Sequence, residues 1–163
     1  ITPTIAVLTT LEVDHLDCYR DLDDIKNAFV QFATKVPFYG FVVLCLDDPA
    51  LLDIMPQLSK KKIITYGLTP QADIQAIDIR HKQNESTFIV LRNGKELGEV
   101  TLQVPGTHNV QNALGAIAVG LELDIPFEKI KNAMVWPVSI FHFLMIDDMS
   151  CDGVILFHTK QFP

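Results

Sequence analysis

The stretch "PGTHNVQNALGAIAVG" (residues 105–120) joins a polar start to an apolar repeat. Apolar residues recur at every third or fourth position, which is the spacing of one buried helical face: Val110, Ala113, Leu114, Ile117, Ala118 and Leu121. Thr107 follows a Pro-Gly turn and is the predicted N-cap. The first turn or so, where free backbone N–H groups and the positive end of the helix dipole lie, therefore carries His108, Asn109 and Asn112.

These three polar residues have two interpretations on spacing alone. They are either a helix start that is capped by its own side chains, or a recognition edge for a polar, planar or anionic ligand. The other motifs of the chain are needed to separate the two.

The composition is that of one ordinary domain with a buried core. Hydrophobic residues make up 48% of the 163 residues and charged residues 20%, close to the globular average. The formal net charge of −7 and the lack of a basic stripe argue against nucleic acid as the main partner. No apolar run reaches the length of a membrane span, and the first residues lack the pattern of a secretion signal, so we expect no membrane partner.

The three cysteines, Cys18, Cys45 and Cys151, show no metal-binding spacing. Cys45 lies inside an apolar run and is expected to be a buried thiol. An odd number of cysteines without such spacing favours a reducing compartment, and we therefore expect a cytoplasmic location.

Apolar runs alternate with helical patterns over the first seventy residues. The strand-like runs are residues 4–10, 41–48 and 62–68. Helical patterns lie between them, at residues 21–35 and 49–58. The pair Asp47-Asp48 precedes Pro49 and is predicted to start the second helix. The alternation is the rhythm of a parallel sheet with helical crossovers.

The pattern changes after Pro70. Apolar and polar residues alternate over residues 72–104, and Asn93-Gly94 is a strong hairpin signal, so we predict an antiparallel meander of about three strands. Another helix is predicted over residues 126–134. The predicted class is α/β, with a mixed, largely parallel sheet flanked by helices and a small antiparallel meander.

Residues 135–163 form an apolar tail without a sustained helical period, which sets them apart from residues 1–134. The tail could form two short strands, at residues 139–146 and 153–158. Because a free tail of this kind would expose many aromatic side chains, we expect it to pack on the same domain.

A second group of polar residues follows the first strand-like run. It comprises Glu12, Asp14, His15 and Asp17. Ligands of α/β sheets bind beyond the carboxyl ends of parallel strands, and Asp and His there suit a divalent cation with nucleotide phosphates, or general base catalysis. The alternative is that the aspartates are turn and cap residues and that His15 is merely half-buried.

Four stretches, in this order, resemble the central domain of the Mur ligases. They are "IAVLTTLEVDHLD", "IKNAFVQFATKVPFYGFVVLCLDDP", "ITYGL" and "VPGTHNVQNALGAIAVGLELDIPFEKIKNA", and together they cover roughly residues 4–133. The "DH" after the first strand and the "PGxHNxxNAxxA" helix start are the specific motifs. The "VPFYGFVVLCLDDP" segment favours the members that add L-alanine. The resemblance implies a mixed sheet flanked by helices, with a small antiparallel sheet.

The resemblance also implies an activity and a site. The parent enzyme would be an ATP-dependent carboxylate–amine ligase that joins UDP-N-acetylmuramate to L-alanine through an acyl phosphate, with ATP and Mg²⁺ as cofactors. His15 matches the magnesium ligand near the transferred phosphate. His108, Asn109 and Asn112 match the helix start that holds ATP, with the asparagines on the adenine side. Asp14 is a secondary candidate, which would orient His15.

The sequence departs from the family pattern in three places. Thr10 stands where the family usually has Asn, and "MVWPVSIFHF" (residues 134–143) replaces a glycine and paired arginines. The GxxGKT phosphate loop is not among the 163 residues. The resemblance places this loop and the uridine-nucleotide domain upstream, and the amino-acid-binding domain downstream. We therefore expect the 163-residue chain alone to lack ligase activity.

Two other functions remain open at this point. One is a sibling ligase that attaches a recycled peptide to UDP-N-acetylmuramate. The other is a non-catalytic remnant, which is a folded α/β module that catalyses nothing.

Overall fold

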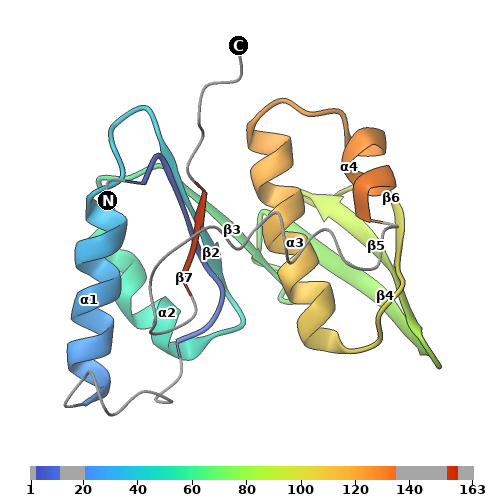
Figure 1. Cartoon of the computed structure of the whole chain (residues 1–163), viewed down its shortest axis with the longest axis horizontal. Coiled ribbons are helices and arrows are strands. Elements are labelled where there is room, and N and C mark those ends of the chain that lie inside the picture. The colour runs from blue at the N-terminus through green and yellow to red at the C-terminus, as the bar shows by residue number, and fades with distance from the viewer. Residues whose placement is uncertain (1–2, 12–20, 135–153, 158–163) are drawn as a thin grey trace.

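The computed structural model of the chain describes residues 3–11, 21–134 and 154–157 (Figure 1). Its strands form one seven-stranded sheet in the order β6-β5-β4-β3-β2-β1-β7. They are β1 (Ile5–Leu8), β2 (Phe41–Cys45), β3 (Ile63–Gly67), β4 (Ile74–Lys82), β5 (Glu85–Arg92), β6 (Lys95–Leu102) and β7 (Val154–Phe157). The α/β class predicted from the sequence is confirmed.

Strands β1 to β4 pair in parallel, each with the next. Every residue of β1 and β2 is buried, which is why both sequences read as continuous apolar runs. Cys45, at the end of β2, is a free, buried thiol as predicted. These strands form the centre of the core.

Helices cover both faces of this sheet (Figure 1). They are α1 (Leu22–Thr34), α2 (Pro49–Ile54), α3 (Thr107–Glu122) and α4 (Phe127–Met134), and a 3₁₀ turn, Met55–Leu58, extends α2. α1 packs beside α2 on one face, whereas α3 contacts β2 to β5 on the other, with α4 against α3 and β6. Within the described ranges, no helix has the length and apolar character needed to cross a membrane.

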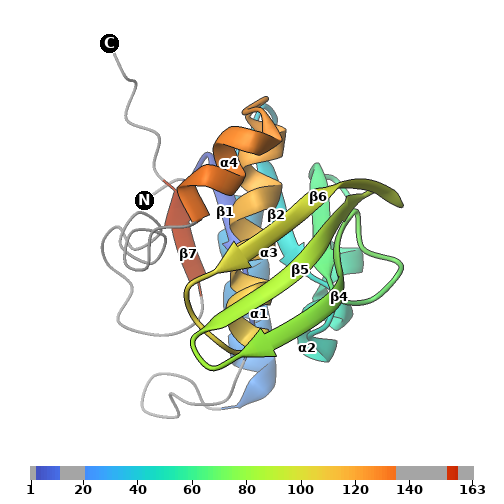
Figure 2. The same cartoon turned by 90° about the vertical axis from the view of Figure 1, so that its right-hand side faces the viewer.

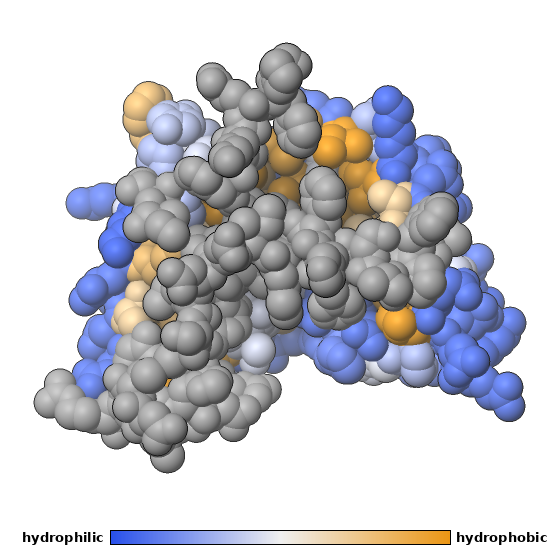
Figure 3. Space-filling view, viewed as in Figure 1, coloured by the Kyte–Doolittle hydropathy of each residue, from blue (hydrophilic) through white to orange (hydrophobic). Residues whose placement is uncertain are grey.

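Strands β4, β5 and β6 form the predicted antiparallel meander, which lies across α3 in Figure 2. Asn93 and Gly94 join β5 to β6 with φ angles of 50° and 75°, which is the pair of positive values that a type I′ hairpin turn requires. The hydrophilic outer end of the meander, at the lower right of Figure 3, is exposed at residues 80–84.

Strand β7 pairs antiparallel with β1, so that Ile5 lies opposite Phe157. It falls within the second strand predicted for the tail, residues 153–158. The first predicted strand, residues 139–146, lies outside the described residues. The separation of the tail from residues 1–134 as a distinct segment stays a prediction.

Tyr66 is buried in β3 beneath α3. Gly115 of α3 makes this packing possible, because a Cβ at that position would lie 3.2 Å from Cζ of Tyr66. In the part of the chain that the structure describes, the Tyr66 hydroxyl is a buried side-chain atom without a hydrogen-bond partner. Burial raises its pKa, and the neighbouring Cys45 thiol adds to this rise.

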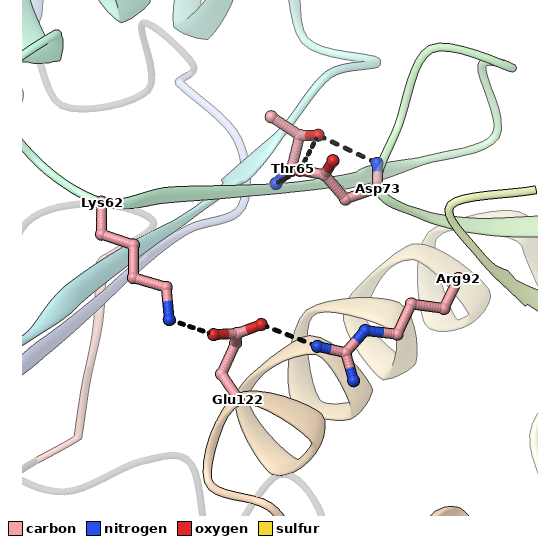
Figure 4. A network of polar contacts seen from close by, with 5 residues as sticks. All are labelled: Lys62, Thr65, Asp73, Arg92 and Glu122. Atoms are coloured by element: carbon pink, nitrogen blue, oxygen red, sulfur yellow. Dashed lines mark hydrogen bonds and ion pairs between the residues drawn. The ribbon is translucent and has the colours of Figure 1, made fainter.

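The last turn of α3 is fixed by ion pairs to two strands (Figure 4). One oxygen of Glu122 pairs with Lys62, beside β3, and the other accepts from Nη2 of Arg92 at 3.1 Å. Figure 4 also shows Asp73, which directly precedes β4. One of its carboxylate oxygens accepts from the backbone N–H of Thr65 at 2.8 Å and from the Thr65 hydroxyl at 2.7 Å. These hydrogen bonds join β3 to the start of β4.

Candidate functional site

The carboxyl ends of β1, β2 and β3 lie side by side, at the lower edge of the sheet in Figure 1. α3 also begins at this edge and runs upward from it. Ligands of α/β sheets bind at such edges. The described segments that meet there are residues 9–11, 46–48, 67–69 and 105–112.

Asp48 connects the end of β1 to the start of α2. Its Oδ1 accepts from the backbone N–H groups of Ala50 and Leu51 at 2.8 and 3.0 Å. It is therefore the N-cap of α2, and the predicted helix start is confirmed. Its Oδ2 accepts from the Thr10 hydroxyl at 3.1 Å and from the Leu11 N–H at 2.9 Å. Thr10, which departs from the family pattern, is thus hydrogen-bonded to the N-cap residue of α2.

Asp47 has a different set of partners. Both of its oxygens accept from the backbone N–H of Leu68, at 3.0 and 2.8 Å, and Oδ1 also accepts from Thr69 N–H at 3.2 Å. Nε2 of Gln111, in α3, donates to Oδ2 at 2.7 Å. A Cβ on Gly67 would lie 2.8 Å from Oδ1, so a glycine is needed for this close approach. Nothing in the local sequence pattern indicates these contacts.

The start of α3 differs from the prediction. Gly106, not Thr107, is the N-cap, and it has no side chain with which to cap the helix. Its φ of 114° favours glycine, and its carbonyl accepts from the N–H groups of Asn109 and Val110 at 3.1 and 3.3 Å. The helix therefore starts one residue earlier, and the Thr107 hydroxyl instead lies 3.3 Å from Nε2 of His81.

His81 and Ser86 support the turn before α3. The buried Ser86 hydroxyl donates to the carbonyl of Val104 at 2.9 Å, and Nδ1 of His81 lies 2.9 Å from the same hydroxyl oxygen. Because the hydroxyl hydrogen is used by Val104, Nδ1 of His81 is the donor to Ser86. In neutral His81, Nε2 then accepts from Thr107. The sequence analysis did not identify this chain of contacts.

The structure brings His108, Asn109 and Asn112 together in the first turns of α3. His108 is exposed, and the two asparagines are half-buried. Nδ2 of Asn109 donates to the carbonyl of Pro105 at 2.7 Å. This contact agrees with the interpretation that the polar side chains stabilise the start of the helix. For Asn109 at least, a structural function is therefore present alongside any contact with a ligand.

His15 and Asp14 belong to residues 12–20 and lie outside the described residues. Among the side chains that the structure does describe, there is no group of three or more His, Cys, Asp or Glu residues that could hold a metal ion. A site with three or more such ligands on this chain would therefore include at least one residue outside the described ranges.

Solved structures of Mur ligases have this fold. MurF from Acinetobacter baumannii matches with a TM-score of 0.76 and 21% identity, over 91% of this chain and 32% of that chain. UDP-N-acetylmuramate-alanine ligase from Thermotoga maritima matches with a TM-score of 0.68 and 25% identity, over 82% of this chain and 29% of that chain. The fold is that of a Mur ligase domain.

The sequence pattern of the Mur ligase middle domain matches residues 1–120, and the chain belongs to the Mur ligase family. It is 53% identical over 131 residues to the UDP-N-acetylmuramate--L-alanine ligase of Geotalea uraniireducens (strain Rf4), which covers 80% of this chain and 28% of that protein. The chain thus spans less than a third of the length of this relative. The resemblance found in the sequence is confirmed.

Proposed function

We propose that this chain is the central domain of a ligase that forms the amide between UDP-N-acetylmuramate and L-alanine, with hydrolysis of ATP to ADP and phosphate. The observation that carries the proposal is the polar first turn of α3, whose N-cap Gly106 has no side chain, at the carboxyl edge of β1 to β3. The 53% identity to a ligase of this name supports the choice of substrates. We propose a cytoplasmic location for the reaction, as the sequence analysis predicts.

The start of α3 fits an anionic, planar ligand such as ATP. Because Gly106 provides no capping side chain, backbone N–H groups and the positive helix end remain directed at the edge. A Cβ on Gly106 would lie 3.5 Å from Nδ1 of His108 and from Nδ2 of Asn109, so the missing side chain leaves room beside both. His108, Asn109 and Asn112 are the residues that would hold the nucleotide, with the asparagines toward adenine.

The proposed reaction has two steps. The carboxylate of UDP-N-acetylmuramate attacks the γ-phosphorus of ATP, the bond to the β-phosphate oxygen breaks, and ADP leaves. The amine of L-alanine then attacks the acyl phosphate, forms a tetrahedral intermediate and releases phosphate. His15 would hold Mg²⁺, which when bound neutralises the charge on the transferring phosphoryl group.

Two alternatives make different predictions. A sibling ligase would accept a peptide in place of L-alanine, and a remnant domain would support no ligation at all. The identity to the L-alanine ligase favours ligation of L-alanine over both alternatives.

The test is amide formation by the full-length protein that contains this chain. UDP-N-acetylmuramate, ATP and Mg²⁺ are supplied with either L-alanine or a tripeptide, and product and ADP are quantified. We expect product with L-alanine only. Product with the tripeptide only would identify the sibling, and no product with either would identify the remnant. The 163-residue chain alone, which lacks a GxxGKT loop, is expected to give none.

A further inference from the structure

Asp47 joins three elements that lie far apart in the sequence. It follows β2, accepts from Leu68 and Thr69 after β3, and accepts from Gln111 in α3, which lies 64 residues away. Asp47 is half-buried, so these hydrogen bonds are partly removed from water. Hydrogen bonds to a charged carboxylate are shorter and stronger than bonds between neutral groups.

The hydrogen bond from Gln111 acts on the part of α3 that carries the candidate ligand residues. Gln111 is flanked by Val110, which is buried against the sheet, and by Asn112. The other end of α3 is fixed separately, by the ion pairs of Glu122 with Lys62 and Arg92 (Figure 4). Asp47 is therefore a polar anchor for the N-terminal turns, independent of the anchor at the far end.

The adjacent aspartate completes the arrangement. Asp48 holds Thr10 and Leu11, which lead into the segment with His15. Asp47 holds the helix start with Asn109 and Asn112. Because the two aspartates are consecutive in the chain, they hold residues 10–11 and the first turns of α3 at the same edge of the sheet.

We infer that Asp47 is a positioning residue of the nucleotide site, which acts through Gln111 to hold the first turns of α3 at the carboxyl edge of the sheet. This inference rests on the proposed function. Asp47 itself does not contact the nucleotide. Its effect is on where His108, Asn109 and Asn112 lie relative to the segment that follows β1.

The test reverses the polarity of one hydrogen bond. Gln111→Glu places a carboxylate against the carboxylate of Asp47 and displaces the helix start. The double variant Asp47→Asn/Gln111→Glu restores a donor and an acceptor, now exchanged. Gln31→Glu, on the exposed surface of α1, adds the same charge without touching the edge and is the matched control.

The measurement is the steady-state kinetics of the full-length protein. For Gln111→Glu we expect the KM for ATP to rise about tenfold, because a misplaced helix start weakens nucleotide binding, with the KM for L-alanine unchanged. The double variant should recover most of this loss, and the control should match the wild type. A rise in the KM for ATP without a rise in the KM for L-alanine separates positioning from a general loss of stability.

Hydrogen exchange by mass spectrometry gives a second readout that does not depend on turnover. Gln111→Glu should speed exchange in two segments together, residues 67–70 and 107–112, because Asp47 bonds both. If Gln111→Glu fails to fold, Gln111→Met removes the donor without adding charge and should raise the KM for ATP by a smaller factor.

An unchanged KM for ATP in a folded Gln111 variant, or no recovery in the double variant, would overturn the inference while leaving the proposed function standing. A wild-type protein that forms no amide would overturn the proposed function instead.

Discussion

Thr10 donates its hydroxyl hydrogen to Oδ2 of Asp48 at 3.1 Å, although 38 residues separate the two in the sequence. The same oxygen accepts from the N–H of Leu11, and the other oxygen caps α2. One side chain therefore satisfies the end of one strand and the start of one helix. Its removal should affect both elements.

We expect Asp48→Ala to lower the free energy of unfolding by about 2 kcal/mol, since an N-cap is worth roughly 1 kcal/mol and bonds to a charged acceptor somewhat more. Chemical denaturation of the 163-residue chain measures this change. Asp53→Ala is the control. It removes an exposed ion pair between Asp53 of α2 and Lys26 of α1, and it should lower the free energy of unfolding by less than about 0.5 kcal/mol. Equal losses for both variants would show that the cap contributes nothing special.

Tyr66→Phe should stabilise the protein by about 1 kcal/mol near neutral pH, because it removes a buried hydroxyl without a described partner. The pH dependence has a definite sign. Because burial raises the pKa of Tyr66, the unfolded state loses the phenolic proton at a lower pH than the folded state. The free energy of unfolding is therefore unaffected by this group below the ordinary tyrosine pKa and falls as the pH rises above it. Tyr66→Phe should therefore flatten the alkaline fall in stability, measured by denaturation at pH 7 to 11.

Tyr39→Phe is the matched control, because Tyr39 is 69% exposed. It should leave both the stability and its alkaline dependence unchanged. A destabilised Tyr66→Phe variant would mean that the hydroxyl has a hydrogen-bond partner.

His15→Ala in the full-length protein should reduce turnover by far more than it reduces stability, because a proposed metal ligand is lost. Turnover as a function of Mg²⁺ concentration, together with thermal melting, measures the two effects. A variant that melts several degrees earlier but keeps normal turnover per folded molecule would identify His15 as a packing residue.

Asn112→Ala should weaken ATP binding by roughly 1 kcal/mol, about fivefold, while leaving the binding of the sugar nucleotide unchanged. Binding of ATP and of a purine nucleotide without the exocyclic amine is compared by titration calorimetry. The analogue should lose less from the substitution, because its contact with the amide is already absent. Equal losses for both nucleotides would contradict the adenine assignment.

Asn109→Ala offers a contrast within the same helix turn. Its amide donates to the carbonyl of Pro105, so this substitution is expected to reduce stability by about 1 kcal/mol even without nucleotide. Thermal melting of the 163-residue chain, with Asn112→Ala alongside, checks the difference. Equal melting temperatures for the two variants would mean that the hydrogen bond to Pro105 does not contribute to stability.

The strands and helices could be predicted from the sequence because their apolar spacing, turns and caps depend on residues that are close together in the chain. Asn93-Gly94 forces the hairpin through its positive φ angles, and Asp48 before Pro49 marks a helix start through its cap. The assignment of Thr107 as N-cap was wrong because the cap depends on the backbone of Gly106, whose φ of 114° is not visible in the residue spacing.

The contacts of the site could be predicted only in part. The motif around residues 107–112 identified the helix start, and its placement at the carboxyl edge follows from the parallel strands. The function of Asp47 could not be predicted, because its donors Leu68 and Gln111 are 21 and 64 residues away and come together only through the fold. Sequence spacing carries no information on such pairs without the register of the sheet.

The pairing of Ile5 with Phe157 has a consequence for how the protein is made. β1 leaves the ribosome before β7, its outer neighbour, which is synthesised last among the described strands. Until then the outer side of β1 presents unpaired backbone groups, which can recruit a strand from another nascent chain. Completion of this edge is also a pairing of very large sequence separation, which forms slowly. During the interval between the synthesis of these two strands, the open edge of β1 therefore exposes newly made chains to aggregation.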